Sequence, residues 1–168
     1  MDSAIVNRVS ESGLLTLDME KLLPERECTP FDLAPFLFMG LVLKEKDFRL
    51  SVDGHDWQLY GGLNVAVFCS ADAIVPDWAQ MLVVSRLMGI AAQVYPGTTD
   101  EMYKWLLLKN ISELPVNEYT DKRVVVKGCG ERTIPSYAFA AVSARLIPHV
   151  KSLMYGEPCS TVPVYKRK

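Results

Sequence analysis

The stretch that decides the fold is Leu63-Asn64-Val65-Ala66-Val67-Phe68-Cys69, which is followed by a short polar loop and by Pro76. A half-exposed strand would alternate apolar and polar residues, whereas this run is almost continuously apolar. It therefore predicts a strand that is covered on both faces, as in a parallel sheet. Pro76 suits the first turn of a helix, where the missing amide proton costs nothing. The stretch predicts a strand, a loop and a helix in succession.

A second stretch, Val124-Val125-Val126-Lys127-Gly128-Cys129, leads in the same way through a polar loop to Pro135. The interval from Cys69 to Tyr95 equals the interval from Cys129 to Tyr155. We interpret the two stretches as a duplicated strand-loop-helix-strand unit. Alternation of strands and helices is typical of an open, mostly parallel sheet with right-handed crossovers and with helices on both faces. The predicted fold class is therefore α/β, with an N-terminal α+β extension.

The remaining elements can be placed along one domain of residues 1–168. Its predicted parts are an N-terminal extension (1–60), a first repeat unit (61–97), a connecting helix (98–118), a second repeat unit (119–156) and a tail (157–168). Within the extension we expect a strand at 14–18, a shorter strand at 31–33, and helices at 34–40 and 41–52. Thr98 and Glu101 have the spacing of a capping box, which predicts the start of the connecting helix.

The composition limits the class of protein. The chain has 168 residues, is 49% hydrophobic and carries a formal charge of -2, so it is long enough to bury one sizeable core. It contains no run of about 18 apolar residues, and its first residues lack the regions of a signal peptide. We therefore expect a cytoplasmic protein with reduced cysteines and no membrane partner. A pI of about 5.7 gives no electrostatic case for nucleic acid.

Three cysteines form the main candidate site. Cys69 and Cys129 each end a predicted strand ahead of a helix, and Cys159 follows the last predicted strand. In a sheet of the flavodoxin type, the strands that end in Cys69 and Cys129 would be neighbours at the switch point, where open sheets bind ligands. A thiolate near a helix N-terminus is stabilised, and thiolates bind zinc or iron or act as nucleophiles. The chain has no Cys-x-x-Cys motif, so the fold itself must assemble any metal site.

Four other residues are candidates to support the thiolates. His55 is a candidate fourth ligand or a base, although a histidine in a turn is more often a hydrogen-bonding surface residue. The acidic residues Asp72, Glu131 and Glu157 are candidate supporting groups. The simplest role for Asp72 and Glu131 is to stabilise a helix start. Each cysteine also has a plain alternative, because cysteine packs well as a small apolar residue.

Several stretches resemble a bacterial family catalogued as domain of unknown function 2480. They are residues 5–8, 43–49, 55–57, 69–74, 127–130 and 155–163, and the resemblance extends over nearly the whole chain. The family has no assigned activity. The resemblance implies an accessory role in iron-sulphur cluster assembly, with proteins of that pathway as partners. Cys28 lies outside these stretches and is left out of the site.

Three functions are therefore expected, in this order. The first is a cytoplasmic accessory protein in which Cys69, Cys129 and Cys159, with His55, bind zinc or iron or handle sulphur. The second is a small enzyme with one of these cysteines as nucleophile and with His55 or Asp72 as proton carrier. The third is a non-catalytic scaffold for a protein partner, in which the thiols only pack. A large exposed apolar patch away from the carboxyl edge of the sheet would favour the third function.

Overall fold

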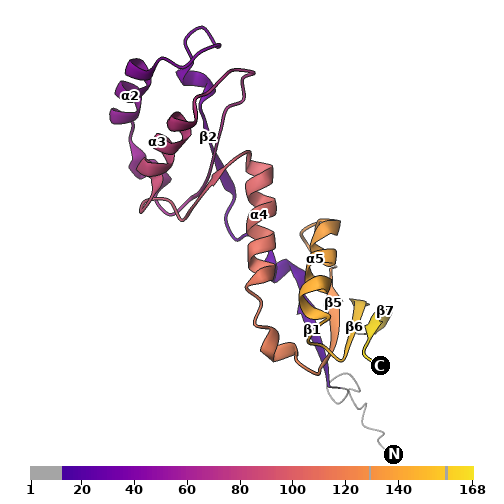
Figure 1. Ribbon diagram of the computed structural model, residues 1–168. Coiled ribbons are helices and arrows are strands. Elements are labelled where there is room, and N and C mark those ends of the chain that lie inside the picture. The colour runs from indigo at the N-terminus through magenta and orange to yellow at the C-terminus, as the bar shows by residue number, and fades with distance from the viewer. Residues whose placement is uncertain (1–12, 129, 158) are drawn as a thin grey trace, which may run out of the picture. The chain divides into compact units, whose positions relative to one another are not determined.

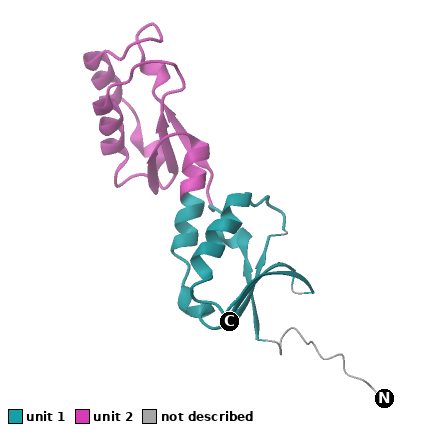
Figure 2. Cartoon of the chain, turned by 45° about the vertical axis from the view of Figure 1, so that its right-hand side comes forward, with its two compact units in different colours: residues 1–24, 106–168 teal, residues 25–105 magenta. Residues whose placement is uncertain are grey.

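The computed structural model describes residues 13–128, 130–157 and 159–168, and these form two compact units. Unit 1 contains the residues up to Pro24 together with Leu106–Lys168, and unit 2 contains Glu25–Trp105. Figure 2 shows the two units in different colours. The boundary after Trp105 falls inside helix α4 (Thr99–Ser112). The single domain of residues 1–168 stays a prediction.

Unit 2 is built on a parallel sheet with the strand order β2-β3-β4. Its elements, in chain order, are β2 (Cys28–Asp32), the 3-10 helix η2 (Ala34–Phe36), α2 (Glu45–Asp53), the 3-10 helix η3 (Trp57–Tyr60), β3 (Asn64–Phe68), α3 (Asp77–Leu87) and β4 (Gln93–Pro96). Several of these elements are labelled in Figure 1. The central strand β3 is the apolar stretch from which the fold was predicted.

Both faces of β3 are covered. Val65 and Val67 lie in a core cluster with apolar residues of α2 and α3, among them Phe48, Val52, Ala79, Val83 and Leu87. Ala66, which points to the opposite face, is fully buried and pairs with Tyr95 of β4. The ring of Tyr95 lies 5.6 Å from that of Trp105 in α4. Val65, Ala66 and Val67 are all fully buried, and burial on both faces explains why the strand is continuously apolar rather than alternating.

Unit 1 is built on a second open sheet with the order β1-β5-β6-β7. Its elements are β1 (Leu14–Asp18), the 3-10 helix η1 (Met19–Leu22), the end of α4, the 3-10 helix η4 (Val116–Tyr119), β5 (Arg123–Lys127), α5 (Ser136–Leu146), β6 (Ser152–Glu157) and β7 (Ser160–Lys166). The first three strands of this sheet are parallel, and β7 is antiparallel to β6. The predicted tail thus contains an edge strand that the sequence analysis did not predict.

The α/β class and the open, mostly parallel sheet are confirmed. The prediction that the strands before Cys69 and Cys129 are neighbours in one sheet is wrong. The strand before Cys69, β3, pairs with β2 and β4, whereas β5, which precedes Cys129, pairs with β1 and β6. Apolar runs show that a strand is buried but do not show which strand lies beside it. Here each run forms an interior strand of its own sheet.

Corresponding elements of the two units lie at a constant interval along the chain. β3 and β5 begin at residues 64 and 123, and α3 and α5 begin at 77 and 136, so both pairs are 59 residues apart. The buried positions of the helices, Ala79, Val83 and Leu87 in α3 and Ala138, Val142 and Leu146 in α5, keep the same interval. The cysteines do not: Cys69 corresponds to Gly128. A duplicated unit stays a prediction. If the two units are aligned with each other, the helices and strands coincide and the two cysteines do not.

The start of α4 is a capping box, as predicted. The hydroxyl of Thr98 accepts a hydrogen bond from the Glu101 amide at 3.3 Å, and the Glu101 carboxylate accepts one from the Thr98 amide at 2.8 Å. The predicted helices at 34–40 and 41–52 are only partly correct. The chain forms a short 3-10 turn at Ala34–Phe36 and a tight turn around Gly40, and α2 begins only at Glu45.

In the part of the chain that the structure describes, no helix combines the length and the apolar character needed to span a membrane.

Candidate functional site

The predicted thiolate residues are distributed over both units. Cys69 follows β3 in unit 2, and Cys159 lies in the turn between β6 and β7 of unit 1, where it is exposed. Cys129 lies outside the described residues. No group of three or more metal-ligating side chains occurs among the described residues. The thiolate site therefore stays a prediction.

Cys69 has the surroundings of a packing residue. Its side chain is half-buried and packs against the core cluster of unit 2. The thiol donates a hydrogen bond to the carbonyl oxygen of Ala71 at 3.6 Å. Half-burial against apolar side chains is the ordinary environment of a cysteine that packs as a small apolar residue.

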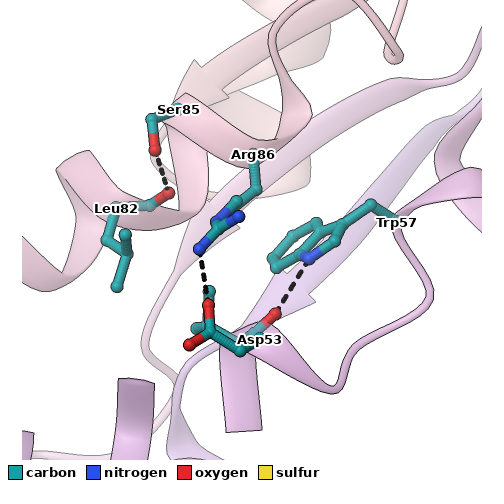
Figure 3. Close-up of polar contacts among 6 residues, drawn as sticks. Asp53, Trp57, Leu82, Ser85 and Arg86 are labelled. Carbon is teal, nitrogen blue, oxygen red and sulfur yellow. Dashed lines mark hydrogen bonds and ion pairs between the residues drawn. The ribbon is translucent and has the colours of Figure 1, made fainter. Parts of the chain in front are cut away.

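His55 lies among aromatic rings. Its ring centre is 4.7 Å from that of Trp57, 5.5 Å from that of Phe31 and 5.8 Å from that of Tyr60. The buried Nε2 atom makes no hydrogen bond to any described residue. The ring of Trp57 is itself held in place, because its Nε1 donates to the carbonyl oxygen of Val52 at 3.0 Å (Figure 3). The imidazole is thus part of an aromatic cluster of unit 2.

The three predicted acidic groups do not surround a common centre. Asp72 and Glu131 are exposed loop residues of different units, and Glu157 is a half-buried residue at the end of β6. Their supporting role stays a prediction. Cys28, which the sequence analysis left out, is half-buried at the start of β2. Burial, and secondarily the negative charge of Asp100, raises the pKa of its thiol, so Cys28 is a poor nucleophile at neutral pH.

The most unusual surface of unit 2 is a group of exposed apolar side chains in the two loops that follow β2 and β3. We call this group the apolar tip. Its members and their exposed fractions are Phe38 (46%), Met39 (79%), Leu41 (67%), Val42 (49%) and Ile74 (87%). Isolated large apolar residues are common on protein surfaces, but a contiguous group marks a binding surface.

The backbone joins the apolar tip into one structure. Phe38 and Val42 form an antiparallel bridge, and Val42 forms a parallel bridge with Ile74 of the other loop. Met39 and Gly40 turn the chain between them with φ values of 53° and 71°. Two central residues with positive φ and a hydrogen bond from the Leu41 amide to the Phe38 carbonyl, at 3.1 Å, are the features of a type I′ turn.

Asp32 fastens the bases of the two loops to each other. Its carboxylate accepts hydrogen bonds from the Ala34 amide at 2.9 Å, from the Ser70 amide at 2.9 Å and from the Ser70 hydroxyl at 2.5 Å. Burial by itself would raise the pKa of Asp32, but the bonds from Ser70 and Ala34 outweigh it and hold the pKa below its usual value. One ionised side chain thus fixes the start of both loops that carry the apolar tip.

The ammonium group of Lys44 lies beside the apolar tip. The Nζ atom of Lys44 lies 3.1 Å from the ring centre of Phe38, which is a cation-π contact. The neighbouring Glu45 is paired with Arg49 at 2.9 Å. Among the described residues, Lys44 has no ion pair with a carboxylate. From Leu33 to Leu43 the sequence contains no charged residue, so Lys44 is the first charge after this apolar run.

The apolar tip was not predicted from the sequence, because residues 34–40 and 41–52 were expected to form helices. Two signals were present: the uncharged run from Leu33 to Leu43, and Gly40 in its middle, which is a turn former rather than a helix former. The tip lies in loops at the carboxyl end of the sheet of unit 2. The sign expected of a scaffold was an apolar patch away from the carboxyl edge, whereas the apolar tip lies at that edge.

Comparisons with known proteins give one match. The comparison with curated proteins and the comparison with solved structures found nothing similar. A family model described as "Protein of unknown function (DUF2480)" matches residues 3–167, which is nearly the whole chain. The chain belongs to this family of proteins of unknown function.

Proposed function

We propose that the protein is a non-catalytic binding module whose apolar tip docks into a cleft of a partner protein. The cleft is apolar, so that it covers Phe38, Met39, Leu41, Val42 and Ile74, and it carries a carboxylate that faces Lys44. The observation that carries the proposal is the conformation of Met39. A large apolar side chain is held 79% exposed on a backbone with φ of 53°.

The conformation of Met39 is costly in two ways. A residue other than glycine, asparagine or aspartate in the left-handed region costs about 1–2 kcal/mol. Asparagine followed by glycine is the preferred pair for such a turn, and it would also remove the exposed apolar side chain. For folding alone, asparagine would therefore be a better residue than methionine at this position. Its unbranched, polarisable side chain is well suited to a protein interface.

The charges around the apolar tip favour a protein partner over an anionic membrane. Segments that bind anionic lipids carry clusters of about four to eight basic residues. Here Lys44-Glu45-Lys46-Asp47 alternates in sign, and the whole chain has a formal charge of -2. One unpaired ammonium group beside an apolar surface instead matches a single carboxylate at the rim of an apolar cleft. Such a pair at the rim would fix the orientation of the partner.

A photo-crosslinking experiment tests the proposal. A photoreactive phenylalanine analogue replaces Leu41 in the full chain in its own cells, and the same analogue replaces Leu59 in the control. The two leucines are matched, since both belong to unit 2 and their exposed fractions are 67% and 68%. We expect one protein to be crosslinked through position 41 and not through position 59. The purified pair should then lose affinity in Lys44→Glu and regain it when one partner carboxylate is replaced by lysine.

Three results would overturn the proposal. Crosslinks to lipid, together with co-sedimentation of the wild type with phosphatidylserine vesicles, would show a membrane surface. Crosslinks to a second copy of the chain would show self-association. Equal crosslinking through both positions would show that the apolar tip binds nothing in particular.

The predicted role in iron-sulphur cluster assembly has two parts. One part names the partner proteins, and the other assigns metal or sulphur binding to the thiols. No described contact supports a thiolate site, and proteins of iron-sulphur cluster assembly stay predicted partners. The crosslinked protein identifies the partner independently of metal content. Metal analysis of anaerobically purified protein addresses the thiols.

A further inference from the structure

A groove on unit 1 carries three cations. It has a volume of about 320 Å³, and its lining is formed by Arg123, Lys151, Ser152, Met154, Pro163, Tyr165 and Lys166. These residues come from β5, β6, β7 and the turn before β6, which are neighbouring segments of one sheet (Figure 1). No aspartate or glutamate is among the lining residues. The volume is in the range of about 300–1,000 Å³ that small-molecule sites occupy.

The strand register explains why the cations converge. Arg123 of β5 pairs with Ser152 of β6, and Ser152 pairs with Lys166 of β7. Paired residues of neighbouring strands project to the same face, so Arg123 and Lys166 stand on either side of Ser152. Lys151 directly precedes Ser152. Three positively charged residues, Arg123, Lys151 and Lys166, thus line the same groove as Ser152, on a chain whose formal charge is -2.

These cations have no carboxylate partner among the described residues. Within the described residues of unit 1, an ion pair joins Arg167 to Asp121 at 2.5 Å. Arg167 also donates to the His149 carbonyl at 2.8 Å, so it ties the end of β7 to the turns before β5 and β6. Asp121 is therefore occupied by Arg167 and is not available to the groove. Like charges held close together without a counter-charge repel each other, and a bound anion would relieve that repulsion.

We infer that this groove binds an organic phosphate, that is, a phosphate monoester with an apolar body. The guanidinium of Arg123 matches the phosphate oxygens in a bidentate manner, and the two lysines supply point charges for a dianion. The side chains of Met154 and Pro163 and the ring of Tyr165 provide the apolar surface on which the body of the ligand packs. The inference rests on unit 1 alone and does not depend on the apolar tip of unit 2.

Titration of the full chain with small probes tests the inference. The probes are phenyl phosphate, inorganic phosphate and benzyl alcohol, followed by NMR amide shifts and by calorimetry. We expect saturable binding of phenyl phosphate with shifts centred on β5, β6 and β7, weaker binding of inorganic phosphate, and none of the alcohol. The affinity for phenyl phosphate should fall as the salt concentration rises.

Substitutions distinguish the groove from general charge. Lys166→Ala and Arg123→Lys should each weaken binding of phenyl phosphate about tenfold, since charge-assisted hydrogen bonds are lost. Lys21→Ala removes an exposed lysine of unit 1 that does not line the groove, and it should leave the affinity within about twofold. The inference is overturned if the wild type shows no saturable binding or if the shifts map elsewhere. It is also overturned if Lys21→Ala has the same effect, or if a short single-stranded oligothymidylate binds more tightly than phenyl phosphate.

Discussion

At position 39, folding favours a residue that tolerates a positive φ, whereas the proposed binding favours a large apolar side chain. Its φ of 53° lies in the region that asparagine and glycine tolerate and that methionine avoids. In a type I′ turn the pair asparagine-glycine is strongly preferred. A residue kept in an unfavourable conformation at an exposed position is a common property of binding sites.

Met39→Asn should therefore stabilise the protein while it removes a contact side chain. We expect the free energy of unfolding to rise by about 1 kcal/mol, seen as an increase of a few degrees in the melting temperature. The control is Met88→Asn, since Met88 is 66% exposed but has an ordinary φ of -61°. It should change the free energy of unfolding by no more than a few tenths of a kcal/mol. A loss of stability in Met39→Asn would show that Met39 supports the fold and would remove the main argument for the apolar tip.

Asp32 should make the stability of unit 2 depend on pH. The pKa of its carboxyl group is lower in the folded protein than in the unfolded chain, chiefly because Ser70 and Ala34 donate to it. Its contribution is therefore complete above the unfolded value of about 3.9 and is lost as the pH falls through the folded value. Asp32→Asn should cost about 1 kcal/mol at neutral pH and progressively less in acid. Urea unfolding at several pH values measures this difference.

The matched control for Asp32 is Asp72→Asn. Asp72 lies in the same loop region, is exposed, and makes no side-chain hydrogen bond or ion pair with any described residue. It should leave the unfolding curves unchanged at each pH. If the two variants behaved alike, the hydrogen bonds of Asp32 would not fasten the loops.

At the scale of elements, the capping box at the start of α4 offers a direct test. Thr98→Ala should lower the free energy of unfolding by about 1 kcal/mol, because the amide of Glu101 loses its acceptor. Thr99→Ala, one residue further into the helix, should change it by only a few tenths of a kcal/mol. The hydrogen bonds from Thr98 lower the pKa of Glu101, so the contribution of Glu101 should disappear as the pH falls through its folded pKa. If the two substitutions lowered the free energy of unfolding equally, the capping role of Thr98 would be contradicted.

Some helices and strands could be predicted from the sequence, and others could not. Strands β1 and β5, the helix after Pro135 and the cap at Thr98 were predicted because each depends on neighbouring residues only. The region from Ala34 to Val42 was assigned to helices because its apolar residues also fit a helical period. The actual turn depends on the pairing of Phe38 with Val42 and of Val42 with Ile74, and the second of these joins residues far apart in the sequence.

At the scale of the whole molecule, the number of sheets could not be predicted. A buried parallel strand is apolar whether its neighbours belong to one large sheet or to two small ones. The proposed cysteine centre depended on one sheet with the strands before Cys69 and Cys129 side by side. The observed pairings place those strands in different sheets, so that argument for the centre no longer holds.

Metal analysis still decides whether the predicted thiolate site exists. If Cys69, Cys129 and Cys159 bind zinc or iron, anaerobically purified protein should contain about one metal ion per chain, and Cys69→Ser should lose it. Cys28→Ser is the control and should keep the metal. Plasma emission spectrometry of the three proteins gives the answer. Wild-type protein without metal above the buffer background would contradict the site.

The most direct test of the central proposal is a calorimetric titration of the crosslinked partner with two leucine variants. Leu41→Asp introduces a charge into the apolar tip, and Leu59→Asp introduces the same charge at an equally exposed leucine of unit 2. We predict that Leu41→Asp weakens binding at least about thirtyfold, as expected for the centre of an interface, while Leu59→Asp stays within about twofold of the wild type. Equal affinities of the two variants would contradict the account.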